Sequence, residues 1–88
     1  MKLKYNFVVR TVGGKAIAVA VGKDAAEFNG MIKLNETGEV IFNELKKDVT
    51  LDSIAERLAS EFDITLEQAK LDADAFIDSL RSAGLIVE

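Results

Sequence analysis

The stretch that decides the fold reads Phe28-Asn29-Gly30-Met31-Ile32-Lys33-Leu34-Asn35-Glu36-Thr37-Gly38. Its Asn29-Gly30 pair predicts a tight turn into a short strand, Met31–Leu34. The strand stops at Asn35, a residue type that caps helix N-termini, and a helical period follows. Since no later segment offers this strand a second partner, we expect it to be the edge of a sheet. An exposed edge can bind an extended peptide.

Two further strands are predicted upstream, over residues 5–12 and 15–21. Gly13-Gly14 between them is a two-residue hairpin signal. In the second strand, Ala16, Ala18 and Ala20 alternate with larger residues and therefore share one face. A face that carries only methyl groups would let another element approach closely.

Three helices are predicted downstream. The first begins at Asn35, the second at Thr50, and the third at Thr65, with Gln68 at the capping-box position of the third. Each carries apolar residues at helical spacing. Gly84 stands where a C-terminal cap belongs, and residues 85–87 can add a short extended tail.

The predicted fold is thus one α+β domain over residues 1–88. A three-stranded antiparallel sheet is followed by three helices (βββααα), and the last two helices form a helix-turn-helix unit. The arrangement resembles a winged helix. A chain of 88 residues has room for one modest core.

The composition excludes several classes of function. There is no cysteine and no histidine, which removes thiol nucleophiles, thiolate metal sites and the usual proton shuttle. The acidic residues Asp72, Asp74 and Asp78 share no complete ligand set, so we expect no metal, no cofactor and no enzymatic activity. No apolar run or signal core is evident, which predicts a cytoplasmic protein.

Charge is distributed unevenly along the chain. Residues 1–34 carry six basic and two acidic side chains, whereas residues 35–88 carry five basic and thirteen acidic ones. A groove between the two halves would be basic on one wall and acidic on the other. The third helix is acidic, which disfavours the alternative of a nucleic-acid-binding or transcription-regulating domain.

The candidate peptide-binding site joins the edge strand to the third helix. The strand supplies Met31, Ile32, Lys33 and Leu34, and the helix supplies Ala69, Lys70, Ala73 and Phe76. The alternative is that Ala69, Ala73 and Phe76 belong to the core. Edge-to-edge pairing of two copies into a homodimer is a further possibility.

The chain resembles the PqqD-like family, named after the coenzyme PQQ synthesis protein D. The resemblance rests on an ordered set of residues running from Leu34-Asn35-Glu36-Thr37-Gly38 through Ile41, Leu45, Thr50, Ile54-Ala55, Leu58, Asp74-Ala75-Phe76-Ile77 and Leu80 to Gly84-Leu85-Ile86. It extends over nearly the whole chain, from about Phe7 to Ile86.

That resemblance implies a winged-helix recognition element for ribosomally made, post-translationally modified peptides (RiPPs). Such a domain is a peptide chaperone: it binds the leader of a precursor peptide as a strand added to its third strand, against its third helix. It then presents the precursor to a modifying enzyme, often a radical SAM enzyme. The resemblance leaves open whether the pathway is PQQ biosynthesis or another RiPP pathway.

Overall fold

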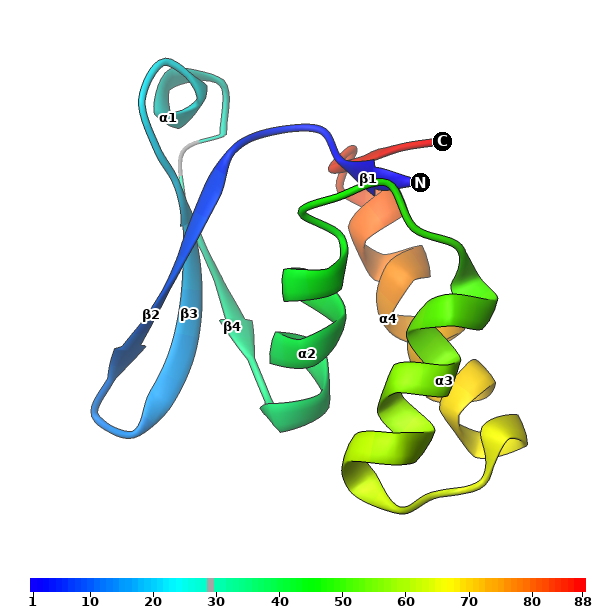
Figure 1. Ribbon diagram of the computed structural model, residues 1–88. Coiled ribbons are helices and arrows are strands. Elements are labelled where there is room, and N and C mark those ends of the chain that lie inside the picture. The colour runs from blue at the N-terminus through cyan, green and yellow to red at the C-terminus, as the bar shows by residue number, and fades with distance from the viewer. Residues whose placement is uncertain (29) are drawn as a thin grey trace.

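The computed structural model describes residues 1–28 and 30–88, so the turn predicted at Asn29-Gly30 lies partly outside the described residues. Along the chain the elements are β1 (Lys2–Leu3), β2 (Phe7–Val12), β3 (Lys15–Ala20), α1 (Asp24–Glu27), β4 (Met31–Leu34), α2 (Glu36–Glu44), α3 (Leu51–Phe62), α4 (Leu66–Ser82) and β5 (Ile86–Val87). The sheet β2-β3-β4 lies to one side of α2, α3 and α4 (Figure 1).

The three-stranded sheet is antiparallel throughout, as predicted. Ala18 of β3 lies between Val9 of β2 and Ile32 of β4, and Ala16 is paired with Leu34. This face is the inner one: Ala18 is fully buried, and Ala16 and Leu34 are buried with it. The alanine face therefore lies against the helices, where short side chains allow close packing.

Each of the three long helices begins at its predicted cap. Asn35 accepts a hydrogen bond from the Gly38 amide at 2.7 Å. Thr50 and Ser53 form a complete capping box, in which a serine takes the place of the usual Glu or Gln. The capping box predicted for α4 is only half formed. Thr65 accepts from the Gln68 amide, but the Gln68 side chain donates instead to Asp72, at 2.9 Å.

The core lies between the sheet and the helical layer. Phe7 of β2 contacts both Phe42 of α2 and Phe28, with ring centroids 5.1 and 5.5 Å apart in edge-to-face geometry. The fully or almost fully buried large side chains come mainly from the helices: Phe42, Ile41, Leu45, Ile54, Leu58, Ile77 and Leu85. Between α3 and α4 the chain reverses at Asp63, which has a left-handed φ of 53°.

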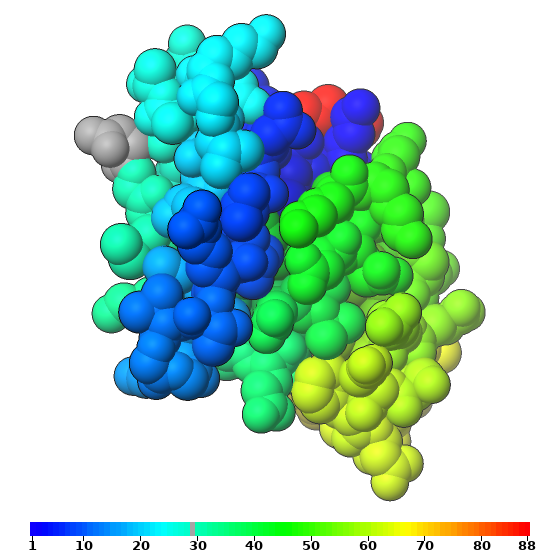
Figure 2. Space-filling model, turned by 60° about the vertical axis from the view of Figure 1, so that its left-hand side comes forward, coloured from blue at the N-terminus to red at the C-terminus, as the bar shows by residue number. Residues whose placement is uncertain are grey.

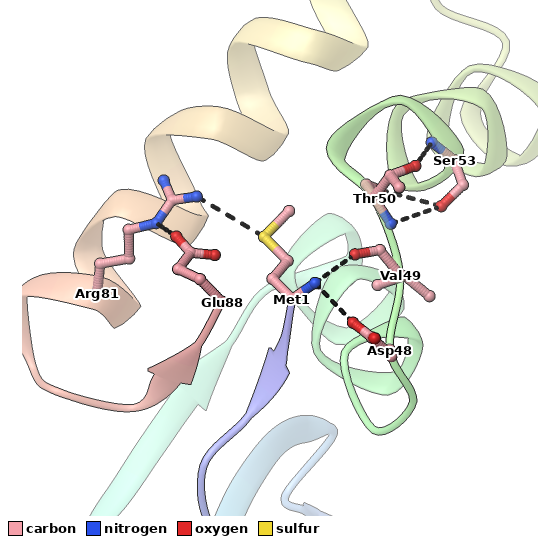
Figure 3. Close-up of polar contacts among 7 residues, drawn as sticks. All are labelled: Met1, Asp48, Val49, Thr50, Ser53, Arg81 and Glu88. Atoms are coloured by element: carbon pink, nitrogen blue, oxygen red, sulfur yellow. Dashed lines mark hydrogen bonds and ion pairs between the residues drawn. The ribbon is translucent and has the colours of Figure 1, made fainter.

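The two chain ends meet in a second, two-stranded sheet, in which β1 pairs antiparallel with β5. Figure 3 shows how the Met1 ammonium reaches the connection between α2 and α3. It donates to Asp48 Oδ1 at 2.7 Å and to the Val49 carbonyl at 2.8 Å. Arg81 of α4 donates to Glu88 at 2.7 Å, so the C-terminal residue is also held against a helix.

The element order departs from the predicted βββααα in two places. The segment after Gly22, for which the sequence predicts a plain connection, contains α1, and the sequence does not predict β1. The extended tail is confirmed, with β5 as its paired part. A four-residue helix and a two-residue strand are too short to show a period in the sequence.

Candidate functional site

Strand β4 is an edge of the main sheet. It pairs with β3 on one side, and within residues 1–28 and 30–88 no strand pairs with its other side. Its backbone donors and acceptors on that side therefore have no partner strand among the described residues. Met31, at the start of the strand, is 61% exposed. The edge predicted from the sequence is present.

A depression of about 680 Å³ opens where β4 ends. Its lining comes from the β2–β3 turn, from β3 and β4, from the first turn of α2 and from the middle of α4: Gly14, Lys15, Ala16, Lys33, Leu34, Asn35, Glu36, Glu39 and Phe76. Three segments far apart in the sequence, residues 14–16, residues 33–39 and Phe76, thus meet around one concave surface beside the edge strand. A concave, partly apolar surface next to an open strand edge can hold both the backbone and the side chains of an extended peptide.

Phe76 of α4 contacts the first turn of α2 at a glycine, Gly38. Gly38 is buried in the first turn of α2, and a Cβ placed on it would lie 3.4 Å from Cε1 of the Phe76 ring. The same Cβ would lie 2.9 Å from Oδ1 of Asn35, the oxygen that caps the helix. A Cβ would be in ordinary contact with the ring, so Gly38 mainly makes room for the cap.

The structure places the eight predicted site residues in different environments. Lys33, Leu34 and Phe76 line the depression. Ile32 is half-buried and packs against the core, whereas Met31 points outward. Lys70 is exposed, and its Nζ lies 3.4 Å from Oδ1 of Asp52 in α3.

The two alanines of the predicted site lie in the core. Ala69 and Ala73 are both 0% exposed and belong to the buried cluster, so their side chains offer no surface to a ligand. The structure therefore supports the interpretation that Ala69 and Ala73 belong to the core. The sequence pattern did not separate the interpretations because α4 packs against both α3 and the first turn of α2.

Three further residues around the site are not predicted from the sequence. Lys15, Glu36 and Glu39 line the depression although they lie outside the predicted strand and helix positions. On α4, Gln68 and Asp72 lie two turns and one turn before Phe76 on the same helix face, and they hydrogen-bond to each other at 2.9 Å. These two side chains share the helix face of Phe76 but do not line the depression.

The depression has walls of opposite charge, as the charge distribution predicted. Lys15 and Lys33 lie on the sheet side, and Glu36 and Glu39 on the α2 side. Among the described residues, the ion pairs involve other side chains, at Asp48, Arg57, Lys70 and Arg81. The charges around the depression thus make no ion pair within this part of the chain.

Two kinds of site are not found. Across the described residues no group of three or more His, Cys, Asp and Glu side chains is placed to hold a metal ion. None of the helices described here combines the length and the apolar character that a membrane span requires.

Comparison with known proteins identifies the family. The chain is similar over 97–99% of its length to two solved structures, described as "Lasso peptide synthetase B1 complexed with the leader peptide" (21% identity, 96% of that chain covered, TM-score 0.71) and "TbiB1 in Complex with the TbiA(beta) Leader Peptide" (15% identity, 93% covered, TM-score 0.72). At these identities the likeness establishes the fold. A search of curated proteins finds no match. A family profile, described as Coenzyme PQQ synthesis protein D (PqqD), matches residues 15–86, and the chain therefore belongs to the PqqD family.

Proposed function

We propose that this protein is a non-catalytic peptide chaperone that binds the leader of a ribosomally made precursor peptide. The leader adds as a strand to the free side of β4, and its inward side chains enter the depression lined by Leu34 and Phe76. The bound precursor is then presented to a modifying enzyme. The single observation that carries this proposal is the open edge of β4 beside that depression.

Family membership supports the same function. The two structurally similar proteins are each described in complex with a leader peptide, and both share this fold. The site we propose consists of Met31, Ile32, Lys33, Leu34 and Phe76, with Lys70 at its far end. The side chains of Ala69 and Ala73 support α4 from the core and do not touch the peptide.

The chain acts as one winged-helix-like domain in the cytoplasm, without a cofactor, and α3 and α4 form its helix-turn-helix unit. Its modifying enzyme is a radical SAM enzyme, of the PQQ pathway or of another RiPP pathway. The open edge of β4 is also the surface through which two copies would pair as a homodimer, so a bound leader would compete with dimerisation.

NMR titration tests the proposal directly. Isotopically labelled protein is titrated with synthetic leader segments of precursors encoded beside its gene, and separately with random-sequence duplex DNA. Chemical-shift changes concentrated in residues 31–34 and 70–76 with a leader, and none with DNA, are expected.

Two results would contradict the proposal. Chemical-shift changes confined to residues 50–63 would place the peptide against α3 and not at the edge of β4. Saturable, salt-dependent binding of DNA would favour the nucleic-acid alternative, although α4 carries four acidic and two basic side chains.

A further inference from the structure

The outer face of the sheet is ordered into rows that run across the three strands. Val8, Val19 and Met31 are paired in one row, and all three are apolar. Arg10, Ile17 and Lys33 are paired in the next row, so a cation stands at each end of it. Figure 2 views the molecule from the side of the sheet, with β2 and β3 in blue and the green surface of α2 to their right.

Both rows reach the free edge of β4 with an exposed side chain. Met31 is 61% exposed and ends the apolar row. Lys33 is exposed and ends the basic row. Among the described residues neither Arg10 nor Lys33 takes part in an ion pair, and no acidic side chain lies in either row.

A strand added to β4 would extend each row by one residue. Residues directly opposite each other on neighbouring strands have Cβ atoms roughly 5 Å apart, close enough for opposite charges to attract and like charges to repel. The position opposite Lys33 therefore favours a carboxylate, and the position opposite Met31 favours an apolar side chain. Because side chains on one face of a strand recur at every second residue, these two positions are separated by one inward-facing residue.

We infer that the peptide bound at β4 carries an acidic residue opposite Lys33 and an apolar residue two positions away, opposite Met31. This inference rests on the proposed function and adds a selectivity rule to it. The inward-facing residues are selected by the depression around Phe76, whereas the outward-facing pair is selected by the rows of the sheet. The order of the two residues in the peptide reports the direction in which the added strand runs.

Selection from a phage library of random 12-residue peptides tests the rule. The baits are the parent protein, the variants Lys33→Glu and Met31→Glu, and a control variant, Lys47→Glu. Lys47 is exposed in the α2–α3 connection, so its reversal changes the net charge equally without altering either row. Selected peptides are then synthesised, and their dissociation constants are measured by fluorescence anisotropy.

The parent and Lys47→Glu are expected to enrich Asp or Glu two positions from an apolar residue. Lys33→Glu should enrich Lys or Arg at the same acidic position, and Met31→Glu should change only the apolar position. In a selected peptide, exchange of the acidic residue for lysine should weaken binding to the parent about threefold to tenfold at low salt. The same exchange should strengthen binding to Lys33→Glu.

Two outcomes overturn the inference, and they can be told apart. Peptides that bind the parent with no acidic preference, or with the same preference on Lys33→Glu, would refute the selectivity rule alone. Failure of every bait to enrich peptides above a bare support would also contradict the proposed function.

Discussion

The ring of Phe76 in α4 lies against Gly38 in the first turn of α2, so that a Cβ on Gly38 would approach Cε1 of the ring to 3.4 Å. This contact joins two helices that are separated by α3 in the sequence. The same ring lines the depression beside β4. The absence of a side chain at residue 38 leaves room for the Asn35 cap, and Asn35 also lines the depression.

Replacement of Gly38 by alanine should weaken leader binding but change stability little, because the new Cβ would displace Asn35, which lines the depression. Alanine gains about 1 kcal/mol of helix propensity, but its Cβ would press on Asn35 Oδ1, 2.9 Å away, and disturb a cap of similar value. Calorimetry of peptide binding and thermal unfolding measure the two effects. Asn43→Ala, on an exposed part of the same helix, should leave affinity unchanged. Unchanged affinity for Gly38→Ala would show that the position of Asn35 does not affect peptide binding.

Proline substitutions at Ile32 and Lys33 should have opposite effects. In an edge strand, successive backbone N–H groups point alternately toward the neighbouring strand and away from it. One of the two prolines should therefore break pairing with β3 and destabilise the fold, while the other removes an outward donor and abolishes strand addition in a folded protein. Circular dichroism and anisotropy with a leader peptide distinguish them. Two folded variants that bind as tightly as the parent would show that β4 is not the binding edge.

Enlargement of Ala69 or Ala73 to leucine should destabilise the protein by about 1–3 kcal/mol, because both positions are fully buried in a packed core. Ala75→Leu, on an exposed face of the same helix, provides the matched control and should unfold at nearly the parent's urea midpoint. If Ala69→Leu or Ala73→Leu kept full stability and altered only peptide affinity, a groove role for these positions would be restored.

The contact between Met1 and Asp48 should make stability depend on pH in the acidic range. The hydrogen bond from the Met1 ammonium, assisted by its charge, lowers the pKa of the Asp48 carboxyl below its ordinary value. An aspartate in the unfolded chain titrates at about pH 4. The contact therefore stabilises the fold above that pH, and its contribution is lost as the pH falls through the lowered pKa of the folded state.

Thermal unfolding of Asp48→Asn checks this prediction. The variant should melt slightly below the parent at pH 7, and the difference should shrink as the pH falls below the ordinary carboxyl range. The difference should also shrink in high salt, because the pair is exposed. Asp74→Asn, an exposed residue outside the ion pairs of the described chain, serves as a control. A difference in melting temperature that is the same at pH 7 and pH 2 would rule out the ion pair as its cause.

The sequence by itself determined the three-stranded sheet, the three long helices and the edge strand. These features follow from local signals: Gly13-Gly14 between alternating strands, the caps at Asn35, Thr50 and Thr65, and an apolar period in each helix. Such signals involve residues close together in the chain, so they can be recognised from the sequence alone. Elements of two or four residues, β1 and α1, have no such period and were missed.

Only the tertiary structure decided which face of α4 is available to a ligand. Ala69 and Ala73 look like groove residues in a helical pattern, but packing against other helices buries them and leaves Phe76 at the surface of the depression. The opposed charges of Lys15 and Lys33 on one wall and Glu36 and Glu39 on the other likewise meet only after folding. Helical spacing shows which residues share a face of a helix. Which element packs against that face depends on contacts between segments far apart in the chain.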